Sequence, residues 1–115
     1  MANSLSFEIS TVFEGAHGSV PVVVVAGDVD LATAPVLAGT IREAIASGSR
    51  VVVDLAAVNF IDAAGIGVMA EAADEARADG TVVVLRRPSQ AVRRVMDIVA
   101  LNGALPIEED PAEPG

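Results

Sequence analysis

The stretch VNFIDAAGIGVMAEAADEA, residues Val58–Ala76, passes from a strand pattern to a helix pattern within a few residues. An apolar run ends at Asp62, and two alanines and two glycines then lead into a segment whose composition and spacing predict a helix. Asp62 is placed to cap that helix by accepting hydrogen bonds from N–H groups near Ala64 and Gly65. Strand-to-helix turns often hold the sites of small α/β proteins, so this turn is our candidate site.

Two strands and a helix are predicted before residue 50. Residues 4–13 alternate apolar and polar side chains, as a half-buried strand does. Residues 20–27 are mostly valine and predict a strand covered on both faces, with Pro21 at its start. Helical spacing over residues 34–46 follows, with Thr33 as the predicted N-cap. Gly48 fits the C-terminal cap of that helix.

The alternation of strands and helices continues to the end of the chain. The elements predicted there are a strand at residues 50–55, a helix at 64–78 ended by Gly80, a strand at 81–85, a helix at 89–100 capped by Ser89, and a short edge strand at 105–107. The order ββαβαβα, with room for that final strand, predicts an α/β fold: a hairpin followed by parallel strands with right-handed crossover helices. We expect a mixed sheet of about four or five strands with helices packed on it.

Composition predicts one domain and excludes several classes of partner. At 115 residues and 52% hydrophobic content the chain fits one domain, expected over residues 1–107, and residues 108–115 are acidic and proline-containing, as disordered tails are. The net charge of -9 opposes binding to nucleic acids and anionic membranes. The longest apolar run is far too short to span a bilayer, so we expect a cytoplasmic protein without membrane insertion.

The inventory of reactive groups argues against an enzyme. The chain has no cysteine, and its one histidine, His17, lies in a glycine-flanked turn, where we expect an exposed loop residue. Gly65 and Gly67 resemble part of a phosphate-binding loop. However, the dinucleotide motif needs a third glycine where Ala70 stands, and the nucleotide-triphosphate motif needs a lysine that the chain lacks. We therefore expect no catalytic residues, no cofactor and no metal.

Four acids follow predicted strands: Asp28, Asp30, Asp54 and Asp62. The carboxyl ends of parallel strands meet at one rim of a sheet, so these acids are expected to lie near one another. A phosphate-accepting receiver domain would also need a lysine on a later strand end, and the chain contains none. We interpret the acids as turn formers and helix caps. Binding of a small ligand or a nucleotide at this rim remains an alternative function.

Two motifs resemble a known family. The stretch GDVDLATAP, residues 27–35, and the stretch from Val51 to Leu85 are similar to the STAS domain of bacterial anti-sigma factor antagonists, and the similarity extends from Phe7 to about Leu105. In that family a Gly-acid-hydrophobic-Asp turn precedes helix one. An Asp-Ser-Ser/Thr-Gly-hydrophobic-Gly turn opens helix two.

The resemblance implies a mechanism. An antagonist docks the start of helix two and neighbouring turns on an anti-sigma factor that is also a serine kinase of the histidine-kinase-like ATPase type, which releases the sigma factor. The kinase then phosphorylates the serine after the motif aspartate and ends the interaction. By position, Asp62 is that aspartate, Ala63 stands at the acceptor serine, Ala64 follows it, and Gly65 and Gly67 match the two glycines.

The departure from the family pattern lies at Ala63. Neither Ala63 nor any residue from Arg50 to Gly80 carries a hydroxyl, so phosphorylation of the family's kind is excluded at this turn. We expect a non-phosphorylatable antagonist-like module that stays competent to bind its kinase. The residues expected to contact the partner are Asp28, Asp30, Leu31, Asn59, Asp62, Ala63, Ala64, Gly65, Ile66, Gly67 and Met69. Val29 is also expected to be exposed and is a further position for mutational scanning.

One alternative keeps the fold and changes the role. The alanines at positions 63 and 64 are also good helix formers, so they fit a helix start whose regulatory use has lapsed. The chain would then be a STAS scaffold in a stress-signalling complex, or the accessory subunit of a lipid or anion transporter. Oligomeric state is left open by the sequence.

Overall fold

The structure is a computed structural model, and it describes residues 7–47, 50–99 and 105–108. The elements, in chain order, are β1 (Phe7–Glu14), β2 (Val20–Val29), α1 (Ala34–Ile45), β3 (Arg50–Ile61), α2 (Ala63–Ala78), β4 (Val82–Arg86), α3 (Gln90–Val99) and β5 (Ile107–Glu108). They form one five-stranded sheet in the order β1-β2-β3-β4-β5. β1 is antiparallel to β2 and every later neighbour is parallel, so the predicted mixed α/β fold is confirmed.

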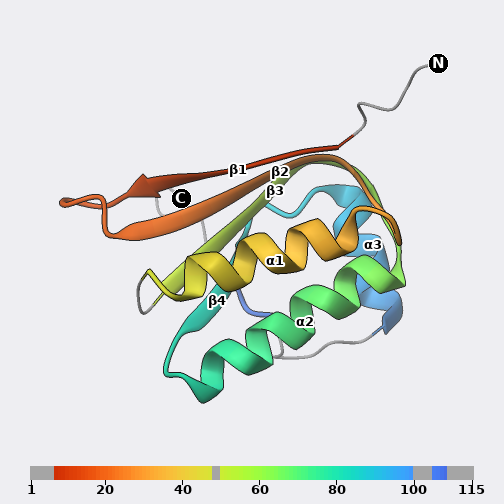
Figure 1. Cartoon of the computed structure of the whole chain (residues 1–115). Helices are drawn as coiled ribbons and strands as arrows, with labels where there is room; N and C mark the ends of the chain where they lie inside the picture. Colours follow the sequence, from red (N-terminus) through yellow and green to blue (C-terminus); the bar gives the residue numbers. More distant parts are fainter. Residues whose placement is uncertain (1–6, 48–49, 100–104, 109–115) are drawn as a thin grey trace.

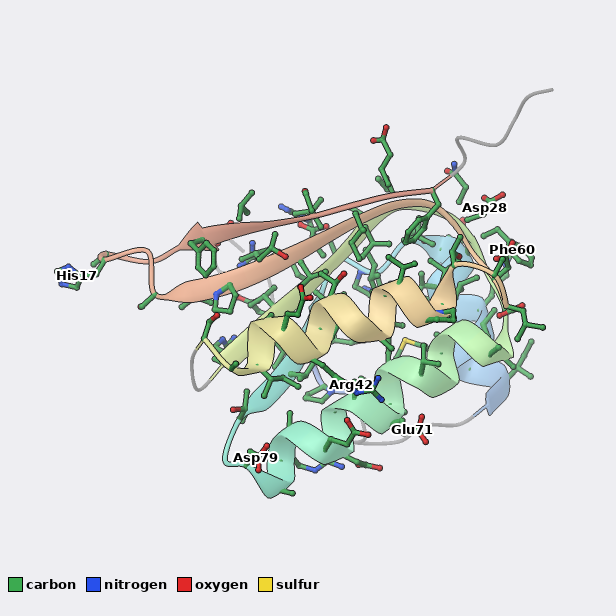
Figure 2. The ribbon with its side chains drawn as sticks, viewed as in Figure 1. His17, Asp28, Arg42, Phe60, Glu71 and Asp79 are labelled. Atoms are coloured by element: carbon green, nitrogen blue, oxygen red, sulfur yellow. The ribbon has the colours of Figure 1, made fainter. Side chains whose placement is uncertain are left out.

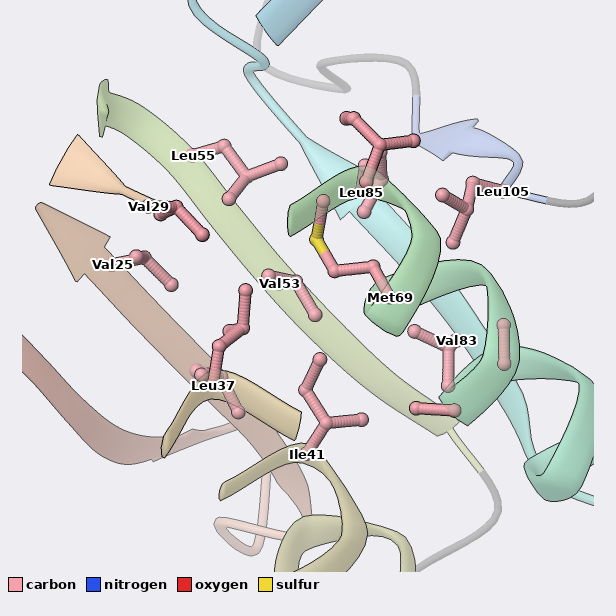
Figure 3. Close-up of a cluster of buried hydrophobic side chains, with 14 of the residues drawn as sticks. Val25, Val29, Leu37, Ile41, Val53, Leu55, Met69, Val83, Leu85 and Leu105 are labelled. Atoms are coloured by element: carbon pink, nitrogen blue, oxygen red, sulfur yellow. The ribbon is translucent and has the colours of Figure 1, made fainter. Parts of the chain in front are cut away.

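The helices pack on one face of the sheet (Figure 1). Each parallel connection steps to the next strand, and right-handed crossovers then place every helix on the same side. Figure 3 shows the resulting aliphatic core, in which Leu37 and Ile41 of α1 and Met69 of α2 meet valines and leucines of the strands. These three side chains are fully buried. Burial of this kind is the main term that holds the domain together.

The opposite face of the sheet carries a second, smaller apolar cluster of Val22, Val52 and Val84, all buried. No helix lies on this face in the described residues. Arg86 of β4 instead reaches across the sheet to Glu14 of β1, with 3.1 Å between Nη1 and Oε2. By strand alternation, this ion pair lies on the same face as the three valines. The prediction that β2 is covered on both faces is therefore only partly right: on the helix-free face Val22 is buried, whereas Val20, Val24 and Ala26 are half-buried.

Strands β2 and β3 continue further than their sequence patterns predicted. β2 ends at Val29 and β3 at Ile61, whereas the pattern predicted ends at residues 27 and 55. Their pairing shifts register between Val24 and Ala26 and again between Gly27 and Asp28, as β-bulges do. The shifts interrupt the side-chain alternation that marks a strand, so the sequence hid these extensions.

The remaining boundaries agree with expectation to within a few residues, except at the Thr33 cap and the final strand. Ser89 caps α3 by accepting from the N–H of Val92 at 3.3 Å, and Gly80 follows α2 with a φ of 81°. Thr33 occupies the N-cap position of α1 but makes no side-chain capping bond. The final strand is Ile107–Glu108, so Glu108 belongs to the sheet and not to the tail. Gly48 and residues 109–115 lie outside the described residues.

Candidate functional site

The ends of β2 and β3 bring the two family-like motifs together. Asp28 pairs with Phe60 and Val29 with Ile61 in the parallel ladder. The N–H of Asp62 then donates to the carbonyl of Val29 at 3.2 Å, which fixes the start of α2 against the end of β2. Figure 2 shows Asp28 and Phe60 at the same end of the molecule. The turn before α1 and the first turn of α2 therefore form one continuous surface.

Asp62 caps α2 as the sequence predicts. Its backbone is extended, with φ -109° and ψ -178°, and its Oδ1 accepts a hydrogen bond from the Gly65 N–H at 3.0 Å. The carboxylate satisfies a donor that a helix start leaves unpaired and interacts favourably with the helix dipole, a contribution of about 1 kcal/mol. Asp62 itself is half-buried. Its first task is thus to hold the helix start in place.

The first turn of α2 presents only part of itself to solvent. Ala63 and Gly67 are exposed and Ala64 is half-buried, whereas Gly65 is buried. A Cβ added at Gly65 would lie 2.8 Å from Ile61 Cγ1 and 2.8 Å from Val29 Cγ1. Gly65 therefore allows close packing of α2 on the ends of β2 and β3. The sequence-based role, close approach of a partner, fits Gly67, where an added Cβ would meet nothing within 4 Å.

The expectation that Val29, Ile66 and Met69 are exposed is wrong. Their relative exposures are 0%, 1% and 0%, and all three belong to the main core. Ile66 and Met69 stand three residues apart on the helix stripe that faces the sheet, and Val29 points to the helix side of β2. None of the three can touch a partner directly. They support the surface from beneath.

The turn between β2 and α1 is held by Asp30. Its Oδ1 accepts from the N–H groups of Ala32 at 3.0 Å and Thr33 at 3.1 Å, so the turn-forming role predicted for this acid is confirmed. The Thr33 hydroxyl donates to the carbonyl of Asp28 at 3.0 Å. This rigid turn projects Leu31 outward with 77% of its surface exposed. An apolar side chain held that far into solvent is a natural contact residue.

Phe60 is a candidate contact that sequence reasoning missed. It is 50% exposed and stands between Asn59, also exposed, and the buried Ile61. Phe60 is one of only three aromatic residues in the chain, and it stands two residues before Asp62, where the family motif begins. These two features could have marked it as a candidate. The hidden extension of β3 concealed its orientation. We use the name rim surface for the exposed or half-buried set Asp28, Asp30, Leu31, Asn59, Phe60, Asp62, Ala63, Ala64 and Gly67.

Asp54 does not belong to the rim surface. β3 continues from Asp54 to Ile61, so this acid lies within the strand. It is 8% exposed, accepts from the Ala56 N–H at 3.0 Å, and pairs with Arg87 Nη2 at 2.5 Å. The predicted gathering of four acids is therefore wrong for Asp54, because the strand does not end where the pattern suggested.

The side chains of the rim surface are acidic, apolar, amide or small. The described ranges hold no group of three or more His, Cys, Asp or Glu side chains placed to bind a metal ion. His17, at the tip of the β1–β2 hairpin, is exposed as predicted and lies far from the rim surface (Figure 2). None of the helices in these ranges is both long and apolar enough to cross a bilayer. The rim surface thus combines acidic, apolar and small residues at a capped helix start.

Comparisons with known proteins identify the family of this fold. The family model described as "Mlab, STAS domain" matches residues 12–107. An anti-sigma factor antagonist from Mycobacterium paratuberculosis has a solved structure that is 30% identical, with a TM-score of 0.73 over 90% of this chain and 88% of that one. The chain therefore belongs to the STAS domain family, and it is similar to anti-sigma factor antagonists within it.

Two structures of SpoIIAA show the same fold at lower identity. The anti-sigma factor antagonist SpoIIAA in its unphosphorylated form is 20% identical, with a TM-score of 0.68 over 90% of this chain and 89% of that one. The phosphorylated form from Bacillus is 19% identical, with a TM-score of 0.63 over 90% of this chain and 92% of that one. A relative of this fold thus exists in both phosphorylation states.

Proposed function

We propose that this protein docks through its rim surface on an anti-sigma factor of the serine-kinase type and so regulates release of a sigma factor, without being switched off by phosphorylation. The observation that carries the proposal is Ala63, exposed at the first residue of α2 beside the Asp62 cap. In the family pattern this position holds the serine that the kinase modifies. The proposal requires no catalysis by the chain itself.

The physical argument concerns what a phosphoryl group would do at this place. A phosphoserine carries a charge near -2, which would lie beside the Asp62 carboxylate and the other acids of the rim surface. That charge would change both the shape and the potential of the contact. Alanine keeps the small, uncharged form of the surface permanently. Loss of the hydroxyl therefore removes the switch and preserves the contact.

Binding to purified candidate kinases from the same organism tests the proposal. Complex formation would be measured by isothermal titration calorimetry with and without ATP. We expect binding that survives incubation with ATP, whereas a family member with the serine would be released. Absence of binding to every such kinase, or release by ATP, would contradict the proposal.

Restoring the hydroxyl tests the position itself. We expect the Ala63→Ser variant to accept labelled phosphate from the kinase and then dissociate from it. Ala78→Ser is the matched control, because it makes the same change at an exposed residue at the other end of α2 and should stay unlabelled. Binding of Ala63→Ser without any labelling would show that Ala63 does not occupy the acceptor position.

A second candidate keeps the STAS fold and changes the partner, and is the alternative that the sequence also allows: an accessory subunit of a membrane transporter. The same rim surface would then dock on a transporter component in place of a kinase. Affinity capture with the native chain and with Asp62→Arg as control separates the candidates. Capture of a transport ATPase that depends on Asp62, without any anti-sigma factor, would favour this second role.

A further inference from the structure

The outer edge of β1 is a second surface that the proposed function does not use. β1 is the first strand of the sheet order, and no described strand lies on its outer side. Its ladder with β2 runs without interruption from Phe7 to Glu14. An edge strand of this length leaves a row of N–H and C=O groups free to pair with another strand.

The usual protections of an edge strand are largely missing from β1. The strand contains no proline, no lysine and no register shift. Its two charges are Glu8 and Glu14, and Glu14 is directed across the sheet to Arg86, at 3.1 Å. Only Glu8 remains as an uncommitted charge on this edge.

Two apolar side chains of β1 are left in solvent. Val12 is 45% exposed and Phe13 is 54% exposed. The β1–β2 hairpin extends beyond the C-terminal end of α1 (Figure 1). Val12 lies on the helix-free face of the sheet, beside Val22, and Phe13 lies on the other face, beside Pro21. Both faces of this edge therefore gain if a further strand is added.

We infer that two copies of this chain associate edge to edge through β1, in an antiparallel, two-fold symmetric pair centred on Ser10. A two-fold axis perpendicular to the sheet keeps the faces of the two copies continuous, so each residue meets a residue of the same face. Centring on Ser10 extends the pairing from Phe7 to Phe13. On the helix side Phe7 then lies opposite the second copy's Phe13. On the helix-free side Glu8 lies opposite the second copy's Val12.

Charge opposes one neighbouring register. Centring the pair on Thr11 would place Glu8 opposite the second copy's Glu14, and like charges directly opposite are destabilising. The register centred on Ser10 places no two acids opposite each other and covers both exposed apolar residues. The occupant that fits this edge is therefore a second copy of the strand.

The hollow next to this edge fits the same arrangement. A hollow of about 370 Å³ is lined by Glu8, Ile9, Ser10, Val24 and Ala26. In the pair, the second copy's Val12 lies opposite Glu8, at the border of this hollow. Glu8 then lies between that valine and Ala26 of β2. The contact is small, so we expect a weak and concentration-dependent dimer.

Charge variants at Val12 test the inference by sedimentation equilibrium. The native chain should show a monomer–dimer equilibrium. Val12→Glu places a new acid opposite Glu8 twice in each dimer, and should raise the dissociation constant about ten-fold. Val12→Lys places a base there and should leave the constant unchanged or lower it. A native chain that stays monomeric at every concentration, or equal weakening by both variants, would overturn the inference.

Cysteine cross-linking tests the register independently, because the native chain has no cysteine. Ser10→Cys places two thiols across the two-fold axis, within disulfide reach. Thr11→Cys is the matched control, since its two copies lie diagonally and on the other face, beyond the roughly 7 Å between Cα atoms that a disulfide tolerates. We expect rapid oxidation to a covalent dimer for Ser10→Cys alone. Equal or faster cross-linking of Thr11→Cys would overturn the register, and circular dichroism would verify that each variant is folded.

Discussion

Gly65 at the start of α2 lies so close to Ile61 at the end of β3 that an added Cβ would be 2.8 Å from Ile61 Cγ1. This close approach seats the start of α2 on the end of β3. Gly67, two residues later, faces open space. Two glycines that look equivalent in the sequence therefore have opposite tasks.

Substituting these glycines one at a time should separate the tasks. Gly65→Ala should lower the free energy of unfolding by about 1–3 kcal/mol, because the new methyl group overlaps Ile61 and Val29. Gly67→Ala should leave stability unchanged or raise it by up to about 1 kcal/mol, since alanine favours a helix. Urea denaturation measures both. Equal effects of the two changes would contradict the packing role of Gly65.

The Asp62 cap gives a second test. Asp62→Ala removes the acceptor for the Gly65 N–H and should cost about 1 kcal/mol of stability. Asp62→Asn keeps a capping oxygen and should cost less, because asparagine also caps helices well. The urea midpoints of the two variants show how much of the stability depends on the capping oxygen. If both variants match the native chain, the hydrogen bond does not contribute to stability.

A third prediction concerns Asp54 and Arg87, which pair at 2.5 Å. Arg87 has a φ of 49°, a left-handed conformation that disfavours a residue with a Cβ. Arg87→Ala loses the ion pair and keeps this strain, so we expect a loss of about 1–3 kcal/mol. Arg87→Gly also loses the pair but relieves the strain, and should be more stable than Arg87→Ala by up to about 1 kcal/mol. A glycine variant less stable than the alanine variant would show that the strain is negligible.

The link between α1 and α2 gives a pH-dependent prediction. Arg42 Nε donates to Glu75 Oε1 at 2.8 Å, and this hydrogen bond, followed by the favourable charge of Arg42, lowers the pKa of Glu75. A carboxyl group with a lowered pKa in the folded state stabilises the fold above its unfolded pKa. That contribution is lost as the pH falls through the folded-state value.

Nuclear magnetic resonance titration of Glu75 checks this directly. In Arg42→Ala the pKa of Glu75 should rise towards the ordinary value of a glutamate. Both groups are about half exposed, so the effect on stability should be small and should shrink in 1 M salt. An unchanged titration of Glu75 in the variant would show that Arg42 is not the cause of the shift.

Much of the fold could be predicted from periodicity. Alternation in residues 4–13 and the valine run of residues 20–27 marked the hairpin strands, and the helical stripes marked the three helices. The ends of β2 and β3 could not be predicted, because two register shifts break the alternation there. Because the end of β3 was predicted too early, Asp54 was placed at the rim and the exposure of Phe60 was missed.

The candidate site could be predicted in position and only partly in composition. Asp62 was correctly placed as the cap because capping depends on local spacing. Ile66 and Met69 were misjudged because helical spacing shows which residues share a face, and not which face the sheet covers. Whether a side chain is exposed depends on how the helices pack against the sheet.

The sequence by itself determined the order of elements, the capped turn at Asp62 and the lack of a hydroxyl from Arg50 to Gly80, since each depends on residue type and local spacing. The tertiary structure alone decided which residues of that turn face solvent. Packing of α2 on β2 and β3 turned Gly65, Ile66 and Met69 inward and left Ala63 and Gly67 in solvent. The physical reason is that burial is set by contacts between elements far apart in the chain.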